Sequence, residues 1–392
     1  MASDAKSLNG NWNFPTPVRF GAGRIKELPE LCLELGIKKP LIVTDPGLAA
    51  LPMLQQAEQL CKDAGLKAAV FADIKPNPVG QNIDDGVKAY KRGKHDGVVA
   101  FGGGSALDAG KAVALMVGQK RPLWDFEDVA DWYTRVNVKG IAPHIAVPTT
   151  SGTGSEVGRS SLIVDEQSHS KKIIFHPRMQ PWIALCDPEL SLGLPPTLTG
   201  ATGMDALSHN LEAYCTNFFH PLGTGIALEG MRLVHEALLD AYDNGDNLTA
   251  RVKMMAASTL GATAFQKGLG AMHAVGHAVG GRFDTHHGTT VAVMMPYVLV
   301  LNRAAIEYKM AALARYLDLP DPSFQGVLSW VLELRKRVGI PHTLVDLGID
   351  PEHVDELAAA ALRDPTAGGN PVTLTADNLH GLIERAMAGV LG

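Results

Sequence analysis

The residues best suited to chemistry are an aspartate and a group of histidines in the second half of the chain. Asp205 and His209 are four residues apart in a segment with helical character, so both side chains lie on one face of a helix. Four of the fourteen histidines then fall within fifteen residues. They are His273 and His277, which again share a helix face, and His286 and His287, which follow a glycine pair where the chain can turn back.

These side chains have the chemistry of a metal site. One carboxylate and three neutral imidazoles leave a divalent ion with a net charge of +1, which suits an alkoxide in an open coordination position. Such an ion acts as a Lewis acid on an alcohol, or polarises an aldehyde in the reverse direction. The ligand types fit iron(II), zinc, nickel or cobalt. A lone histidine is more commonly structural, so the prediction depends on the whole group.

A glycine-rich loop in the first half suits a phosphate. Gly102–Ser105 follow a predicted buried strand, and a helix is predicted to begin near Ala106. Glycines let backbone N–H groups approach an anion, and a helix N-terminus adds partial positive charge, so the loop can bind a pyrophosphate. The spacing differs from the G-x-G-x-x-G fingerprint. A simple tight turn is the alternative.

A second polar loop and an aspartate support a dinucleotide. The sequence PTTSGTGSE, at Pro148–Glu156, follows the predicted strand Ile145–Val147. Ligands of open parallel sheets bind at the carboxyl ends of strands, so we expect the two loops to hold one cofactor. Asp45 ends an earlier strand, and its carboxylate favours NAD over NADP because it binds ribose hydroxyls and repels a 2′-phosphate. A turn-forming role before Pro46 and Gly47 is the alternative.

Two kinds of element must position these groups. In the first half, short apolar runs alternate with helical patterns, which predicts a mostly parallel sheet covered by helices. After Pro195 the apolar residues recur with helical period. Because 392 residues exceed one core, we expect a dinucleotide-binding α/β domain at residues 1–195, a helical metal-binding domain at residues 196–392, and an active site in the cleft between them. The predicted strands are Leu41–Thr44, Ala69–Ala72, Gly97–Phe101, Ile145–Val147, Leu162–Val164 and Ile183–Cys186.

Composition and charge argue against several classes of protein. The net charge of −6, without any run of five or six like charges, argues against nucleic acid as a partner. The first twelve residues lack a signal pattern, and the apolar run Val291–Leu301 is too short for a membrane span and contains Pro296. We therefore expect a cytoplasmic protein with no membrane contact. The four cysteines are widely spaced, which predicts free thiols.

Taken together, the separated motifs resemble the iron-containing (group III) alcohol dehydrogenase family over nearly the whole chain. This resemblance implies a Rossmann-like N-terminal domain and an all-helical C-terminal domain of the dehydroquinate synthase-like type. It also implies NAD and a divalent metal as cofactors, the metal being Fe2+ with Zn2+ as the alternative, and a homodimer. The matching segments are Phe14–Gly23, GGGSALDAGKA, PTTSGTGSE, Asp187–Pro196, GMDALSHNLEAY, the histidine segment and NPVTLT at Asn370.

Matched motif by motif, the resemblance also implies site residues. His277 stays unligated near the nicotinamide and relays the alcohol proton as general base or acid. His286 stands where the family usually has a proline and is not expected to be a ligand. The implied metal ligands are Asp205, His209, His273 and His287. The implied cofactor contacts are Asp45, Gly103, Gly104, Ser105, Asp108, Thr149, Thr150 and Ser155, with Lys172 and Leu190 nearby.

The predicted function is the interconversion of a primary alcohol or hydroxy acid with its aldehyde or semialdehyde by hydride transfer to NAD. Arg159 lies where family members vary, and its planar guanidinium suits a substrate carboxylate; an outward-facing, solvated arginine is the alternative. Three other functions remain open at this point. They are a metal-dependent hydrolase, an NAD- and metal-dependent polyol or sugar-phosphate dehydrogenase or related synthase, and a non-enzymatic metal or nucleotide sensor.

Overall fold

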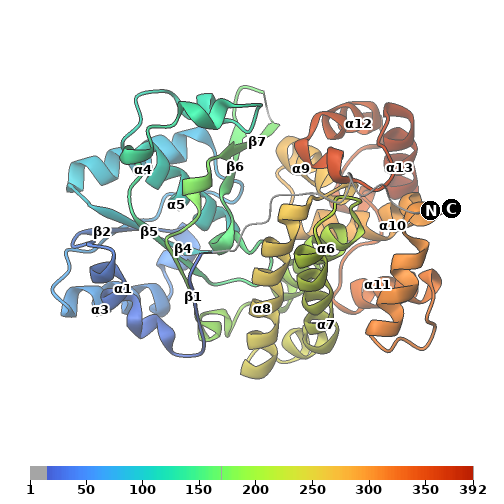
Figure 1. Cartoon of the computed structure of the whole chain (residues 1–392), viewed down its shortest axis with the longest axis horizontal. Helices are drawn as coiled ribbons and strands as arrows, with labels where there is room; N and C mark the ends of the chain where they lie inside the picture. The colour runs from blue at the N-terminus through green and yellow to red at the C-terminus, as the bar shows by residue number, and fades with distance from the viewer. Residues whose placement is uncertain (1–15, 169, 392) are drawn as a thin grey trace. The chain divides into compact units, whose positions relative to one another are not determined.

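A computed structural model describes residues 16–168 and 170–391 (Figure 1). The chain start that lacks a signal pattern, and the first two residues of the matched segment Phe14–Gly23, lie outside the described residues. Contacts divide the described chain into two compact units. The α/β unit contains residues 16–150 and 154–192, and the helical unit contains residues 151–153 and 193–391.

The α/β unit is built on one six-stranded sheet in the order β1-β8-β5-β4-β2-β3. Every neighbouring pair of strands is parallel, which confirms the predicted parallel sheet. Five of the six predicted strands belong to it. Its strands are β1 (Val18–Phe20), β2 (Pro40–Val43), β3 (Ala69–Phe71), β4 (Gly97–Gly102), β5 (His144–Pro148) and β8 (Ile183–Cys186).

The sixth predicted strand, Leu162–Val164, has a different place. It belongs to β6 (Ser160–Asp165), which pairs antiparallel with β7 (Ser170–Phe175) in a separate two-stranded sheet. Sequence patterns missed β7 because its first half is Ser-Lys-Lys and only its second half is apolar. They also missed β1, which is three residues long.

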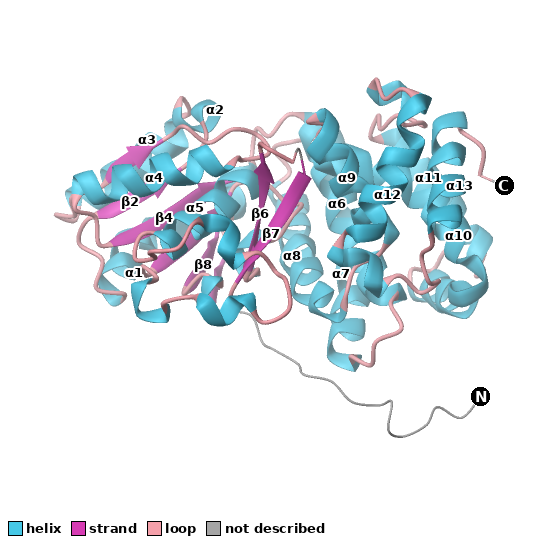
Figure 2. Cartoon of the chain, turned by 90° about the horizontal axis from the view of Figure 1, so that it is seen from above, coloured by secondary structure: helices cyan, strands magenta, loops and turns pink. Residues whose placement is uncertain are grey.

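Alternate side chains of the sheet enter two separate hydrophobic cores. Ile42 and Val99 pack on one face with α1 (Leu28–Glu34) and α3 (Pro52–Asp63). Their neighbours Leu41, Val43 and Val98 pack on the other face with α4 (Gly80–Gly93) and α5 (Gly104–Met116). Figure 2 shows helices on both faces of the sheet. Because both faces are covered, the strands are continuous apolar runs, which made them recognisable in the sequence.

The helical unit is organised around α6, which packs against α7, α8 and α10. Its helices share one large hydrophobic core, which confirms the predicted helical second half. Pro196 and Pro221 stand at the first positions of α6 and α7, where a missing N–H costs nothing. The helices are α6 (Pro196–Cys215), α7 (Pro221–Asp243), α8 (Leu248–Ala264), α9 (Ala271–Phe283), α10 (His287–Tyr316), α11 (Phe324–Arg337), α12 (Val354–Arg363) and α13 (Ala376–Ala388).

Helix α10 is, among the described residues, the one helix long and apolar enough to cross a membrane by length and composition alone, with a mean hydropathy of 1.4. The apolar run Val291–Leu301 looked too short because the helix extends beyond it at both ends. Of its most apolar window, 67% is buried inside the protein. Its apolar residues belong to the core of the helical unit, so α10 has the character of a core helix.

Candidate metal centre and cofactor-binding loops

Three helices of the helical unit bring the predicted metal ligands together. Asp205 and His209 lie on successive turns of α6, His273 lies on α9, and His287 is the first residue of α10. Single ligand atoms of Asp205, His273 and His287 all lie within 4.8 Å of one another. Nδ1 of His209 is 3.8 Å from Oδ1 of Asp205, and its ring centroid is 4.5 Å from that of His273. The four side chains therefore form one cluster.

Unpartnered polar atoms show that this cluster fits a metal ion. In the described part of the chain, Oδ1 of Asp205, Nδ1 of His209 and Nε2 of His273 are buried and have no hydrogen-bond partner. Buried polar atoms are normally bonded, so three such atoms in one cluster need an explanation. An aspartate with imidazoles is a donor set for a divalent transition metal, which would satisfy these atoms.

The protonation of the clustered histidines depends on their surroundings. Burial lowers the pKa of His209 to about 4, so its imidazole is neutral at pH 7, as a metal ligand must be. Burial also opposes protonation of His273. There, however, the hydrogen bond and charge of Glu212 outweigh burial, and the pKa of His273 is raised.

Glu212 fixes the orientation of His273. It lies on α6, and its Oε2 accepts hydrogen bonds from Nδ1 of His273 at 2.7 Å and from the backbone N–H of Gly270 at 2.9 Å. Its Oε1 accepts from the N–H of Met272 at 2.7 Å. One carboxylate thus caps the N-terminus of α9 and holds the imidazole with Nε2 directed away from the carboxylate. Partners of this kind orient metal-ligating histidines and raise their basicity.

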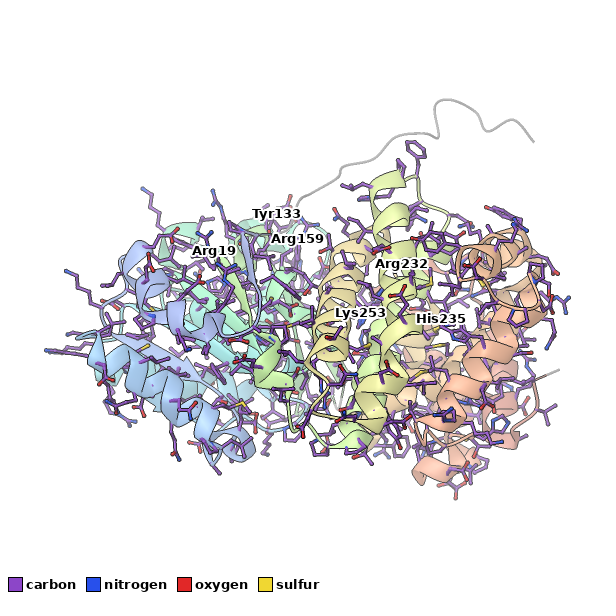
Figure 3. All side chains as sticks on the ribbon, turned by 90° about the horizontal axis from the view of Figure 1, so that it is seen from below. Arg19, Tyr133, Arg159, Arg232, His235 and Lys253 are labelled. Carbon is purple, nitrogen blue, oxygen red and sulfur yellow. The ribbon has the colours of Figure 1, made fainter. Side chains whose placement is uncertain are left out.

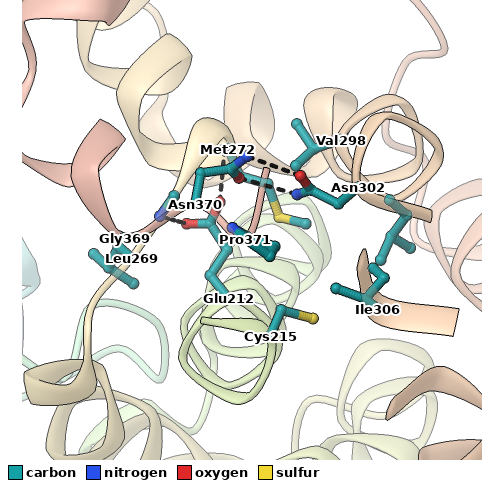
Figure 4. A pocket seen from close by; sticks show the side chains of 12 residues that line it. Glu212, Cys215, Leu269, Met272, Val298, Asn302, Ile306, Gly369, Asn370 and Pro371 are labelled. Carbon is teal, nitrogen blue, oxygen red and sulfur yellow. Dashed lines mark hydrogen bonds between the residues drawn. The ribbon is translucent and has the colours of Figure 1, made fainter. Parts of the chain in front are cut away.

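The start of the NPVTLT segment, Asn370 and Pro371, lines a pocket together with Glu212 (Figure 4). Asn370 and Asn302 exchange two side-chain hydrogen bonds, at 3.0 and 2.8 Å. Oδ1 of Asn370 also accepts from the N–H of Ala271 at 3.2 Å. Asn370 therefore braces the start of α9, the helix that carries His273.

His277 lies beside the ligand cluster on α9. Its ring centroid is 5.5 Å from that of His287, with nearly parallel planes, and 5.9 Å from that of His273. Its Nδ1 is 2.9 Å from Oδ2 of Asp364. His286 is exposed and caps α10, where its ring accepts from the N–H of Thr289, so it takes no place in the cluster.

The glycine loop joins β4 to α5 in the α/β unit. Gly102 has a φ of +147°, a conformation that side-chain-bearing residues rarely adopt. The helix begins at Gly104, two residues before the predicted start near Ala106, so Ser105 lies in its first turn. Backbone N–H groups of a first turn have no partner within the helix and can bind an anion.

Asp45 and the second loop lie next to the glycine loop. The N–H of Thr149 donates to the carbonyl of Gly102 at 3.0 Å, and a Cβ on Gly103 would lie 3.4 Å from Cγ2 of Thr150. Oδ1 of Asp45 accepts from the N–H of Leu48 and caps α2 (Pro46–Ala49), as the turn-forming alternative predicts. Its Oδ2 lies 3.6 Å from where a Cβ of Gly102 would be.

Asp108 and Ser155 bind each other. Oδ1 of Asp108 accepts from the Ser155 hydroxyl and lies 3.1 Å from Nζ of Lys111, while Oδ2 accepts from the N–H of Leu162. The side chains of Asp108 and Lys111 are 9% and 1% exposed. These groups tie α5 to the second loop and to β6, so they shape the loops from within.

Residues 151–153, the middle of the second loop, make their contacts in the helical unit. A Cβ on Gly152 would come 2.9 Å from the side chain of Thr202 on α6. The loop therefore belongs partly to each unit, whereas the sequence pattern placed all of it with the α/β half.

The two remaining residues that were predicted to contact the cofactor, Lys172 and Leu190, have other partners in the α/β unit. Nζ of Lys172 is 3.0 Å from Asp165 and 3.6 Å from Glu127, and it lies over the ring of Trp124. These contacts hold the Lys172 ammonium beside the β6–β7 hairpin. Leu190 is buried in the hydrophobic core that contains α1 and α3.

Arg159 is partly buried beside the hairpin (Figure 3). Its guanidinium lies 5.7 Å from the ring centroid of Phe175, which makes an edge contact with Tyr133. Burial raises the pKa of the nearby Asp128, and the positive charge of Arg159 partly offsets that effect. Arg159 therefore lies beside the ring of Phe175, with part of its side chain accessible to solvent.

Sequence reasoning missed the two carboxylates that orient the histidines. Glu212 could have been identified from the sequence, because it follows His209 by three residues on the same predicted helix. Asp364 had no such signal, since it is 87 residues from His277 in the chain.

Comparison with known proteins agrees with the geometry. The sequence matches the family model described as iron-containing alcohol dehydrogenase over residues 15–188, and its C-terminal counterpart over residues 199–387. It is 37% identical over 382 residues to 4-hydroxybutyrate dehydrogenase of Cupriavidus necator, a match that covers 95% of this chain and 98% of the relative.

Two solved structures extend the comparison. A 1,3-propanediol oxidoreductase matches with a TM-score of 0.91 and 32% identity, over 96% of this chain and 99% of the other. Sulfoacetaldehyde reductase of Bifidobacterium kashiwanohense, solved with NAD+, matches with a TM-score of 0.85 and 28% identity, over 96% and 99%. These relatives are named for alcohol or aldehyde chemistry, which supports the predicted dehydrogenase and lends no support to a hydrolase. The resemblance drawn from the sequence is confirmed, and the chain belongs to the iron-containing alcohol dehydrogenase family as an alcohol-oxidising oxidoreductase.

Proposed function

We propose that the protein is an NAD-linked, iron-dependent alcohol dehydrogenase whose N-terminal domain, residues 1–195, binds NAD and whose C-terminal domain, residues 196–392, binds the metal. The observation that carries this proposal is the cluster of unpartnered ligand atoms on α6 and α9, with His273 oriented by Glu212. Support for NAD comes from the glycine loop, from Asp45 beside it, and from the relative solved with NAD+.

The residues divide the work as follows. Asp205, His209, His273 and His287 would hold the metal, with Zn2+ as the alternative to Fe2+. When bound, the metal supplies Lewis-acid stabilisation of the substrate oxygen, and NAD accepts the hydride. His277 would accept the hydroxyl proton of the substrate. The first-turn N–H groups of α5 would bind the pyrophosphate, while the pair of Asp108 and Ser155 keeps the loops in shape.

For the substrate, we propose a small alcohol that carries an anionic group, such as a hydroxy acid. Two relatives are named for compounds that carry an anionic group, the hydroxy acid 4-hydroxybutyrate and the aldehyde sulfoacetaldehyde. Arg159 is the candidate anion-binding residue, because a guanidinium held against Phe175 keeps its fork available to a carboxylate. Loss of preference for 4-hydroxybutyrate over 1-butanol in Arg159→Ala would support this role. Unchanged preference would remove it.

The deciding experiment follows NADH formation at 340 nm. The purified protein is stripped with a chelator, then reloaded with iron(II) or zinc, and assayed with NAD and a panel of alcohols and hydroxy acids. We expect activity that needs both NAD and metal. Turnover that persists without nucleotide, or no turnover with any metal and substrate, would overturn the proposal.

The homodimer rests on the family resemblance, and the cytoplasmic location rests on the expectation stated from the sequence. We propose a cytoplasmic homodimer. Light scattering on the eluted protein should give the mass of two chains, and the mass of a single chain would contradict the dimer.

A further inference from the structure

Asp364 divides its two carboxylate oxygens between a loop and a histidine. It is the N-cap of the short 3-10 helix η12 (Pro365–Gly369), and its Oδ1 accepts hydrogen bonds from the N–H and the hydroxyl of Thr366. Its Oδ2 lies 2.9 Å from Nδ1 of His277. The side chains of Asp364 and His277 are 9% and 6% exposed. The pair is thus held where water competes little with its hydrogen bond.

Both sides of this contact are fixed by packing. Helix α12, which ends at Arg363, packs against α9. After Asp364, Gly369 approaches the loop before α9 so closely that a Cβ there would come 2.1 Å from the carbonyl oxygen of Leu269. The segment that carries Asp364 therefore has little freedom to move relative to His277.

The carboxylate is ionised at neutral pH. Burial alone would raise the pKa of Asp364. Electrostatic interaction with His277 and hydrogen bonds from His277 and Thr366 outweigh burial and lower this pKa. An ionised carboxylate can only accept a hydrogen bond, so it selects the imidazole form that carries a proton on Nδ1.

We infer that Asp364 is a positioning residue for the proton-accepting step: it fixes the ring of His277 and holds the tautomer whose Nε2 carries the lone pair. This inference rests on the proposed function. In the reaction, the substrate hydroxyl proton passes to Nε2 while the carbon-bound hydrogen leaves with its electron pair to NAD, and the carbon–oxygen double bond forms. The resulting imidazolium keeps its Nδ1–H bond to the carboxylate, which stabilises the positive charge.

The test is Asp364→Asn. Asparagine keeps an oxygen to cap η12 but offers its NH2 group to His277, which favours the opposite tautomer. We expect kcat to fall on the order of 100-fold, in the range of general acid–base contributions, with KM and metal content within twofold of wild type. In a His277→Ala background the same change should alter kcat by less than twofold, because the residue that it positions is absent.

A matched control is Asp350→Asn. Asp350 caps the 3-10 helix η11 (Pro351–His353) with Oδ1, as Asp364 caps η12, but it is exposed and far from His277 in the chain sequence. We expect its kcat to stay within twofold of wild type. If kcat of Asp350→Asn fell as much as kcat of Asp364→Asn, the effect would be explained by helix capping, and the inference would be overturned.

A readout independent of turnover separates this inference from the proposed function. Nitrogen-15 NMR of histidine-labelled protein, with the His277 signals identified from His277→Ala, reports the tautomer directly. We expect Nδ1–H in the wild type and a shift toward Nε2–H in Asp364→Asn. If the wild type shows Nε2–H, the inference fails even where Asp364→Asn does not fold. If the wild type lacks dehydrogenase activity, the proposed function fails, while the tautomer still shows whether Asp364 positions the ring.

Discussion

The candidate metal cluster of the helical unit and the glycine loop of the α/β unit differ in the kind of group that each offers to a ligand. In the cluster, Oδ1 of Asp205, Nδ1 of His209 and Nε2 of His273 are buried and have no hydrogen-bond partner among the residues that the structure describes. Around the glycine loop, the side chains of Asp108 and Ser155 are already bonded to each other, and the groups suited to a ligand belong to the backbone. Ligand binding at the cluster would therefore depend on which side chains are present. Ligand binding at the glycine loop would depend on the conformation of the main chain.

The largest effect should come from removing one side chain of the cluster. We expect His273→Ala to lose bound metal and at least about 1,000-fold in kcat/KM, equivalent to roughly 4 kcal/mol of transition-state stabilisation. Metal content by atomic spectroscopy and turnover on the same samples measure both losses. His277→Ala is the control: it should keep its metal and lose on the order of 100-fold in rate. Equal metal loss in both variants would mean that the two histidines have the same role.

The second largest effect should be a loss of folding stability when Asp108, beside the glycine loop, is replaced. Asp108→Ala leaves the ammonium of Lys111 buried without its 3.1 Å ionic partner, and we expect the free energy of unfolding to fall by about 3 kcal/mol. Urea denaturation measures this change. The double variant Asp108→Ala/Lys111→Met should recover much of the loss, because it buries no unpaired charge. A stable single variant that binds NAD poorly would instead give Asp108 a direct role in cofactor binding.

A smaller effect should separate the two tasks of Asp45. Asp45→Asn keeps the oxygen that caps α2 but removes the negative charge beside Gly102. We expect the ratio of kcat/KM for NAD to that for NADP to fall about tenfold, or 1.4 kcal/mol, with no change in the thermal midpoint. An unchanged ratio would limit Asp45 to the turn-forming role.

The smallest effect concerns a buried group of the helical unit that already has a partner. Lys267 donates to the carbonyl of Tyr214 near the end of α6, and burial lowers its pKa to about 8. Between this value and its ordinary 10.5, the unfolded chain binds more protons than the folded one, so stability should rise with pH. From pH 7.5 to 9 we expect a rise of about 1 kcal/mol.

Urea midpoints across this pH interval, with wild type set against Lys267→Met, isolate the contribution of Lys267. The rise should be absent in Lys267→Met and present in Lys253→Met, which removes an exposed, ion-paired lysine of the same unit. An equal rise in all three proteins would assign it to other groups.

Much of the fold could be predicted because its signals are local. Strands buried on both faces, such as β4, are continuous apolar runs, and the ligand pair Asp205 and His209 shows a helical spacing. The hairpin strand β7 escaped because half of it is polar and its pairing partner is not visible in its own sequence. Asp364 escaped for a related reason. Its contact with His277 arises from the packing of α12 on α9, and no short sequence window contains both residues.

The same dependence on distant segments affects how far the protein can be divided. Residues 151–153 lie between stretches of the α/β unit yet contact Thr202 of the helical unit, so between residues 16 and 391 the chain passes from one unit to the other three times. A gene cut near residue 193 would separate α6 from the tripeptide that covers it. The family model that matches residues 15–188 thus includes a tripeptide, residues 151–153, that belongs to the helical unit. Shuffling one half between relatives would require the second loop to be exchanged with the helices that it contacts.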